Sequence, residues 1–312
     1  MTTLPRAIEN TYFAWLGEKY TGKVRDVYSR GDTKVLIATD RLSAYDRLLT
    51  TVPLKGEVLT QLANFWFQKV AHIVSHHVLA IPDPNVMIAT AVEIIPIEVV
   101  VRGYLAGGGW REYSATGQVS GVTLPQGMHE FQKLDSPIIT PSTKEPAGNH
   151  DIPISEDEIV RRGIVSEAVW SKVRALALQL FHLGSEEVAS RGLLLVDTKY
   201  EFGVKDAEVV LADEIHTLDS SRFWVASSFE AYKTGGAQPE MLDKEPVRRW
   251  LAERGFMGEG QIPEITDRER ALWMEHYLKS FELITGKSLS PNSKGDPLER
   301  MDANLRKFFN IV

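Results

Sequence analysis

The chain has 312 residues, 43% of them hydrophobic, which is enough to bury the core of one large domain or two moderate ones. A net charge of −7 argues against nonspecific nucleic-acid binding, and the absence of cysteine excludes disulfides, thiolate metal sites and thiol nucleophiles. No stretch approaches the roughly 20 apolar residues of a membrane span, and the N-terminus lacks a basic region followed by an apolar run, so we expect a cytoplasmic protein with no membrane partner.

Two paired strands are predicted near the N-terminus, at residues 22–28 and 34–39. Lys23 and Arg25 share one face of the first strand, directly after Gly22. A basic strand face after a glycine could hold nucleotide phosphates, although the spacing of a Walker loop is absent. An ordinary exposed strand explains the same pattern.

Polar side chains cluster at residues 39–46, at the end of the second predicted strand, which is a common position for ligand binding. A loop followed by a helix cap explains the same residues. Apolar residues then recur at helical spacing over residues 56–77. His72 and His76 would lie one turn apart on that helix, but no third ligand is nearby, so a metal site is the less favoured interpretation.

Two strand-like runs are predicted between residues 85 and 102, and in the second Glu98 and Arg102 share one face. Gly107–Gly109 follow. Such glycines let a backbone approach a ligand, although a flexible hairpin would also use them. Residues 114–153 are too long and polar for a simple linker, so we expect a functional or mobile segment.

Capping signals predict the helices of the second half. Ser155 with Glu158 and Thr266 with Glu269 match the capping-box pattern. In this pattern, the side chain of each residue of the pair accepts a hydrogen bond from the backbone N–H of the other. The predicted helices cover residues 155–191 with a restart near 166, 243–254, 266–285, and a last segment opening at 296–297.

A strand with a two-residue period begins at Leu193. One of its faces starts apolar and ends in three charges of mixed sign, at Asp197, Lys199 and Glu201. A packed interior tolerates such charges only if something pairs with them. Alternation resumes at residues 208–215, and residues 203–206 can turn the chain into a hairpin.

If the hairpin register places Lys199 opposite Asp213, then Glu201 lies diagonal to Asp213 and two carboxylates converge beside a lysine. Mg²⁺ commonly binds one or two carboxylates together with nucleotide phosphates, so this face could hold a metal–phosphate centre. A solvated hairpin face with cross-strand ion pairs explains the same pattern. The G-x-S-x-G, H-E-x-x-H and G-x-G-x-x-G motifs are absent, so serine hydrolases, zincins and Rossmann dehydrogenases lose their usual support.

The order of elements predicts an α/β or α+β fold with a nucleotide cleft between a strand-rich N-terminal part and a mixed C-terminal part. Several motifs between residue 22 and about residue 251 resemble, in the same order, those of the SAICAR synthetase family. They are GKVRDVY at 22–28, TDRLSAYD at 39–46, IIPIEVVVRGYLAG at 94–107, TPSTKE at 140–145, GNHD at 148–151, LVDTKYEFG at 195–203, DEIHTLDSSRFW at 213–224, and Asp243-Lys244 with Arg248.

The resemblance implies an ATP- and Mg²⁺-dependent ligase of de novo purine biosynthesis. It would join L-aspartate to the carboxylate of carboxyaminoimidazole ribotide (CAIR), giving the succinocarboxamide SAICAR, ADP and phosphate through an acyl phosphate. The implied fold is two-lobed α+β with a kinase-like or ATP-grasp-like nucleotide cleft. Residues 1–110 would form a strand-rich nucleotide-binding lobe, and residues 111–312 a mixed lobe that binds substrate and Mg²⁺ and carries the C-terminal helices. The implied partners are CAIR, L-aspartate and ATP, without nucleic acid, and no oligomeric state is implied.

The resemblance also implies roles for individual residues. Glu201 and Asp213 match ligands of Mg²⁺ and nucleotide, supported by Asp197 and Glu214, and Lys199 matches a cation between the substrate carboxylate and the γ-phosphate. ATP-phosphate contacts are implied at Gly22, Lys23 and Arg25.

The ribotide is implied to be held by Arg102 and Arg222, since a guanidinium group suits phosphate or carboxylate. Asp46 is a candidate to orient the aspartate amine, and with Lys199 and Arg222 it completes the implied catalytic residues. The further positions that match substrate contacts are Asp40, Arg41, Ser43, Ser142, Thr143, Lys144, Lys244 and Arg248.

One departure from the family concerns the ribotide phosphate. The chain has Gly107-Gly108 where the signature usually has Gly-Ser, which removes a hydroxyl group. A backbone N–H or a neighbour such as Ser120 could replace it; otherwise affinity would fall, because a hydrogen bond to a charged group contributes about 1.5–3 kcal/mol.

Two other classes of protein would share part of this pattern. A small-molecule kinase would use the same Mg²⁺–ATP site but would not require aspartate. A noncatalytic nucleotide-binding module would not need Lys199, Glu201 and Asp213 together.

Overall fold

The contacts within the computed structural model divide the chain into two units. Unit 1 contains residues 1–65, 78–91 and 241–312, and unit 2 contains residues 66–77 and 92–240. The structure describes residues 4–144, 151–289 and 295–311. The two units differ from lobes divided at residue 110, because the strand that starts at Glu93 pairs within unit 2 and the C-terminal helices pack in unit 1.

Unit 1 is built on an antiparallel sheet with the strand order β1-β2-β3-β7-β6. Its strands are β1 (Glu18–Thr21), β2 (Arg25–Arg30), β3 (Thr33–Ala38), β6 (Val78–Asp83) and β7 (Val86–Thr90), and a separate hairpin pairs β4 (Arg41–Ala44) with β5 (Arg47–Thr51). The predicted pair of strands is confirmed as β2 and β3. β2 starts later than predicted because the Gly22 N–H bonds the Arg25 carbonyl at 2.8 Å, which closes a tight turn.

Residues from both ends of the chain cover one face of this sheet. Val35 and Ile37 of β3 are fully buried, since alternate strand residues point to the same side. Met301 and Leu305, one helical turn apart, pack on them. The helices of unit 1 are a short 3₁₀ helix (Ala14–Leu16), α1 (Lys55–Val70, whose end from Trp66 belongs to unit 2), α6 (Glu245–Ala252), α7 (Asp267–Thr285) and α8 (Pro297–Phe308).

Helix boundaries in unit 1 follow their caps. Thr266 makes the predicted capping box with Glu269, and Asp296 caps α8 by accepting from the Leu298 N–H. The helix predicted over residues 56–77 is shorter than expected. α1 ends at Val70, so a histidine pair on one helix is wrong, and the described residues contain no cluster of three or more His, Cys, Asp or Glu that could hold a metal.

Unit 2 is built on an antiparallel sheet with the order β11-β8-β13-β14, in which β12 also pairs with β8 and β15 with β13. The long central strands are β8 (Glu93–Tyr104) and β13 (Leu193–Lys205). The others are β9 (Gln118–Val119), β10 (Val122–Thr123), β11 (Lys133–Ile139), β12 (Ser142–Thr143), β14 (Glu208–Ala212) and β15 (Ser221–Val225), of which β9 and β10 form a hairpin of their own. The polar segment at 114–153 therefore contributes strands to this unit.

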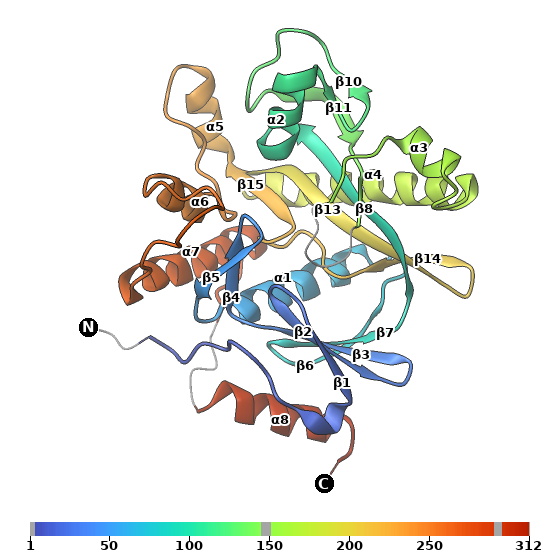
Figure 1. Ribbon diagram of the computed structural model, residues 1–312, viewed down its shortest axis with the longest axis vertical. Coiled ribbons are helices and arrows are strands. Elements are labelled where there is room, and N and C mark those ends of the chain that lie inside the picture. Colours follow the sequence, from blue (N-terminus) through green and yellow to red (C-terminus); the bar gives the residue numbers. More distant parts are fainter. Residues whose placement is uncertain (1–3, 145–150, 290–294, 312) are drawn as a thin grey trace. The chain divides into compact units, whose positions relative to one another are not determined.

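The helices of unit 2 are α2 (Gly107–Thr116), α3 (Glu156–Arg161), α4 (Glu167–Ala189) and α5 (Ala226–Lys233). The predicted restart near residue 166 is confirmed, with Ser155 and Ser166 capping α3 and α4. α4 packs along β13 and β8 (Figure 1). α2 begins at the three glycines of residues 107–109, and α5 lies in a segment for which we predicted no helix. Among the described residues, no helix is long and apolar enough to cross a bilayer.

The β13–β14 hairpin turns later than predicted. Asp206 and Ala207 form the turn, with φ values of +51° and +62°, and Lys205 pairs with Glu208 across it. Gly203 instead lies inside β13, where a Cβ would come within 2.7 Å of the Val92 side chain. The turn predicted at residues 203–206 is therefore wrong, because Gly203 provides room for a neighbouring chain segment.

Candidate active site

Three charged residues form a row across three neighbouring strands of unit 2. Asp197 of β13 lies opposite Arg102 of β8 and opposite Arg222 of β15. Its buried Oδ2 accepts hydrogen bonds from Nη1 of Arg102 at 2.9 Å and Nη1 of Arg222 at 2.6 Å. Arg102 also donates from Nε to the Thr140 hydroxyl at 2.8 Å. Because two guanidinium groups share one carboxylate, the row carries a net positive charge that suits an anion.

The N-terminus of α2 lies against both guanidinium groups. A Cβ on Gly107 would lie 2.3 Å from Nη2 of Arg222, and one on Gly109 would lie 3.0 Å from Nε of Arg102. Gly107 also has a φ of +54°, which favours glycine. The first N–H groups of a helix lack intrahelical partners and attract anions. The glycines thus allow backbone N–H groups and two arginines to converge on one position.

Further along β13, the same sheet face carries two carboxylates and two lysines. Lys199 Nζ contacts Glu98 Oε1 at 2.5 Å and lies 3.6 Å from Glu201 Oε1. Lys144, which follows β12, pairs with Oε2 of Glu201. The predicted common face of Asp197, Lys199 and Glu201 is confirmed by the register. The Glu201 side chain is only 8% exposed, which argues against a solvated hairpin face.

Burial and neighbouring charges shift the pKa values of these groups. Burial alone would lower the pKa of Lys199, but the carboxylates of Glu98, Glu201 and Asp213 raise it well above its usual value. Burial raises the pKa of Glu98, and Lys199 only partly offsets this. Burial lowers the pKa of Arg102, although a guanidinium group stays protonated in proteins. Lys199 is therefore a cation at neutral pH.

Asp213 lies directly after the last residue of β14, Ala212, outside the hairpin. Glu201 pairs with Ala212, so Lys199 does not lie opposite Asp213 and the register we considered is wrong. A φ of +62° at Asp213 starts the loop that leads to Ser220, whose carbonyl accepts from the Lys199 N–H at 2.9 Å. Asp213 still acts on the charge of Lys199, but from a loop and not from a cross-strand position.

The predicted ATP-phosphate residues lie at the start of β2 in unit 1. Lys23 is largely exposed and pairs with Asp46 at the turn between β4 and β5. Gly22 and Arg25 close the turn that presents Lys23. The structure therefore joins one predicted phosphate contact to the predicted amine-orienting residue, both within unit 1.

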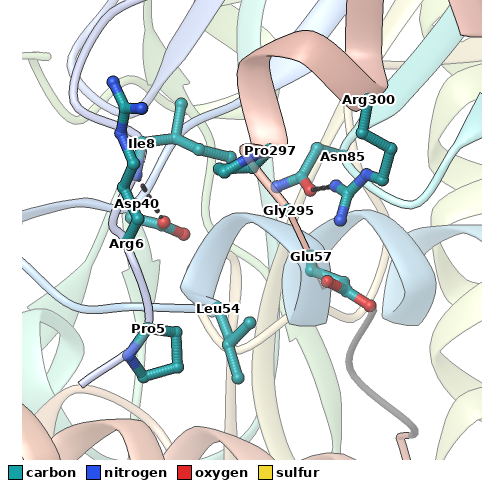
Figure 2. A pocket seen from close by; sticks show the side chains of 10 residues that line it. All are labelled: Pro5, Arg6, Ile8, Asp40, Leu54, Glu57, Asn85, Gly295, Pro297 and Arg300. Atoms are coloured by element: carbon teal, nitrogen blue, oxygen red, sulfur yellow. Dashed lines mark hydrogen bonds between the residues drawn. The ribbon is translucent and has the colours of Figure 1, made fainter. Parts of the chain in front are cut away.

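Asp40 and Arg41 are held in the interior of unit 1. The Asp40 carboxylate accepts from the N–H groups of Ile8 at 2.7 Å and Gly56 at 2.9 Å, and burial raises its pKa to about 6. It lines a cavity of about 30 Å³, room for about one or two waters (Figure 2). Arg41 is 3% exposed and donates to Asp26 at 2.9 Å. These bonds anchor both charged groups within unit 1, and their roles as substrate contacts stay predictions.

The remaining predicted substrate residues are half-buried. Ser142 pairs with Glu98 in the sheet register, and Arg248 donates to Asp243 at 3.4 Å and Glu245 at 3.2 Å. Glu214 accepts from the Thr217 hydroxyl at 2.6 Å. The half-buried residues are Ser43, Ser142, Thr143, Lys244 and Arg248, while Glu145 and Gly148–His150 of two motifs lie outside the described residues.

Glu98 belongs to the lysine–carboxylate cluster but received no role from the sequence. The shared face of Glu98 and Arg102 was predicted, and Arg102 was assigned to the ribotide. The missing information was that β8 pairs with β13, because a contact between segments about 100 residues apart leaves no local signal. The position of Glu98 inside a matched family motif was the available hint.

Comparisons with known proteins agree with this architecture. A profile of the SAICAR synthetase family matches residues 18–264. The chain is 43% identical over 312 residues to a putative phosphoribosylaminoimidazole-succinocarboxamide synthase 2 of Mesorhizobium japonicum, covering 97% of this chain and 100% of the relative. It is 42% identical over 301 residues to a phosphoribosylaminoimidazole-succinocarboxamide synthase of Legionella pneumophila, covering 94% of this chain and 96% of the relative.

Solved structures give the same result. The chain is similar to the SAICAR synthase of Saccharomyces cerevisiae complexed with SAICAR, with a TM-score of 0.81, 30% identity, and coverage of 91% of this chain and 100% of that one. It is also similar to a type-2 SAICAR synthetase in complex with ADP, with a TM-score of 0.67, 26% identity, and coverage of 88% and 100%.

The mixed helix-and-sheet fold and these matches define a ligase of purine biosynthesis that forms a carbon–nitrogen bond. The chain belongs to the SAICAR synthetase family, as its motifs predicted. The predicted α+β class is thereby confirmed, and the family favours the ligase over the small-molecule kinase.

Proposed function

We propose that this chain uses ATP to join L-aspartate to the carboxylate of CAIR, giving SAICAR, ADP and phosphate. One observation carries the proposal. A single face of the unit 2 sheet holds two groups of charged residues. The first is Asp197 with its two arginine partners, and the second is the lysine–carboxylate cluster, two to four residues further along β13. At strand spacing, the distance between the two groups is roughly 7–13 Å. CAIR has a phosphate at one end and a carboxylate at the other, so one molecule can reach both positions.

The ribotide phosphate binds where Arg102 and Arg222 meet the start of α2. Two guanidinium groups supply charged hydrogen bonds, and the backbone N–H groups of the first helical turn add donors. These N–H groups replace the hydroxyl that the family signature places at residue 108.

The chemistry takes place in two displacements near Lys199. A carboxylate oxygen of CAIR attacks the γ-phosphorus of ATP and ADP leaves, which converts a poor electrophile into an acyl phosphate. The aspartate amine then attacks the acyl carbon, phosphate leaves, and the nitrogen loses a proton. Both displacements place negative charge on oxygen, and the fixed ammonium of Lys199 stabilises it. Lys23 and Arg25 are the candidate contacts for the ATP phosphates, and Asp46 is the candidate to orient the amine.

Glu201 and Asp213 are the residues that would hold Mg²⁺. Their donor set fits this ion, which prefers carboxylate oxygens and commonly takes only one or two of them together with phosphates. Bound Mg²⁺ would neutralise charge on the nucleotide phosphates.

A coupled assay of ADP release, with CAIR and L-aspartate omitted in turn, tests the proposal. We expect full turnover only when both are present with ATP, and SAICAR as the product identified by mass. Undiminished ADP production without aspartate would reject the ligase and fit a small-molecule kinase.

A further inference from the structure

Glu98 lies where a negative charge destabilises the fold unless a cation pairs with it. In the sheet register it lies directly opposite Glu201, and like charges on facing residues of neighbouring strands repel. Both side chains are mostly buried, with 12% and 8% exposed. Burial raises this cost, because a carboxylate removed from water needs a partner.

Lys199 is the partner that makes the arrangement stable. The residue directly opposite Lys199 is Val100, which offers no polar group. The ammonium instead reaches diagonally to Glu98 at 2.5 Å and stays 3.6 Å from Glu201. A lysine side chain is long and flexible, so its charged end has no fixed place without such a bond. Glu98 is therefore nearer to the Lys199 ammonium than Glu201 is.

We propose that Glu98 is a positioning residue, which holds the Lys199 ammonium beside Glu201 where the substrate carboxylate and the γ-phosphate react. The identity of that reaction rests on the proposed function, but the placement of the ammonium does not. The negative charge of Glu98, and not its volume, carries this role.

Two substitutions separate charge from packing. Glu98→Gln keeps the shape of the side chain and removes the charge. Glu98→Asp keeps the charge and shortens the side chain by one methylene group. The flexible Lys199 side chain can move by this distance and keep the ion pair. If charge positions Lys199, the kcat order is wild type, then Glu98→Asp, then Glu98→Gln. If Glu98 only fills space, Glu98→Gln equals the wild type and Glu98→Asp is the weaker variant.

Glu93→Gln is the matched control. Glu93 lies on the same strand β8 and is exposed, so the same chemical change there should leave kcat unaltered. For Glu98→Gln we expect kcat to fall about 10- to 100-fold, the effect of a displacement of about 1 Å at a reacting centre. The KM for ATP should stay within about threefold and the melting temperature should be retained. A kcat of Glu98→Gln equal to that of Glu93→Gln would overturn the proposal.

Crystal structures of the wild type and Glu98→Gln give a readout that does not depend on turnover. We expect Nζ of Lys199 to move by more than about 1 Å or to lose a single position in the variant. If Nζ stays within about 0.5 Å of its wild-type position, the proposal is wrong. A different result would reject the proposed function, namely ADP release by the wild-type enzyme without aspartate. In that case, the position of Nζ would still decide the role of Glu98.

Discussion

Gly107→Ala should weaken ribotide binding, because the new methyl group takes space that the Arg222 guanidinium occupies. The added Cβ would lie 2.3 Å from Nη2 and 2.5 Å from Cζ of Arg222, far inside van der Waals contact. Either the arginine or the start of α2 must move. Both belong to the position that we propose for the phosphate.

Two separate effects are expected from this substitution. Residue 107 has a φ of +54°, and a non-glycine residue there costs about 1–2 kcal/mol of stability, or roughly 2–8 °C in melting temperature. Displacement of Arg222 removes a charged hydrogen bond to the phosphate, worth about 1.5–3 kcal/mol, which raises the KM for the ribotide about 10- to 150-fold.

Gly108→Ala is the control for Gly107→Ala. A Cβ on Gly108 meets nothing closer than 3.8 Å, at Arg111. Alanine is also favoured over glycine within a helix by about 0.5–1 kcal/mol, so this variant should be slightly stabilised with an unchanged ribotide KM. The assay is thermal unfolding together with steady-state kinetics at saturating ATP and aspartate. A Gly107→Ala enzyme with a lower melting temperature but an unchanged ribotide KM would show that Arg222 does not hold the ribotide.

Three further predictions follow from buried charges. Glu201→Gln should lower kcat about 100-fold or more and change the melting temperature by only a few degrees, whereas a collapse in thermal unfolding would mark a structural residue. Burial raises the folded-state pKa of Asp40 from 3.8 to about 6, so folding takes up a proton between these two pH values. The free energy of unfolding should therefore fall by about 3 kcal/mol as pH rises through this window. Urea unfolding at pH 4 and pH 7 should show a smaller loss in Asp40→Asn, and equal losses would refute the assignment. Arg300→Ala should destabilise unit 1 by about 3–5 kcal/mol in urea, since Arg300 bonds both oxygens of the fully buried Asp83 side chain at 3.0 and 3.1 Å, while Arg161→Ala in an exposed pair should cost less than about 1 kcal/mol.

Local sequence patterns predicted the features that depend on neighbours in the chain. The two-residue period placed Asp197, Lys199 and Glu201 on one face of β13, because the side chains of any strand alternate. Caps placed the ends of α3, α4, α7 and α8, because a cap is read within a few residues. Family motifs supplied the chemistry that these patterns alone left open.

Long-range pairing decided what the local patterns could not. The edge of β13 changes its partner from β15 to β14 near Lys199, and no alternation in the sequence reveals such a change. The carboxylate of Asp40, in a polar segment, bonds the backbone N–H groups of Ile8 and Gly56. No local pattern in the sequence predicted these two partners, because they lie 32 and 16 residues away along the chain.

The packing of unit 1 bears on how the protein can be shortened for laboratory work. The family profile ends at residues 18 and 264, but half of the members of the core cluster on this sheet lie outside those limits, namely Ile8, Phe13, Leu16, Met301 and Leu305. A fragment trimmed to the profile would leave the apolar side of β2, β3 and β7 in water, where it becomes an adhesive surface. We expect such a fragment to aggregate on expression. The range that the family profile matches, residues 18–264, is therefore smaller than the range needed to cover the core of unit 1.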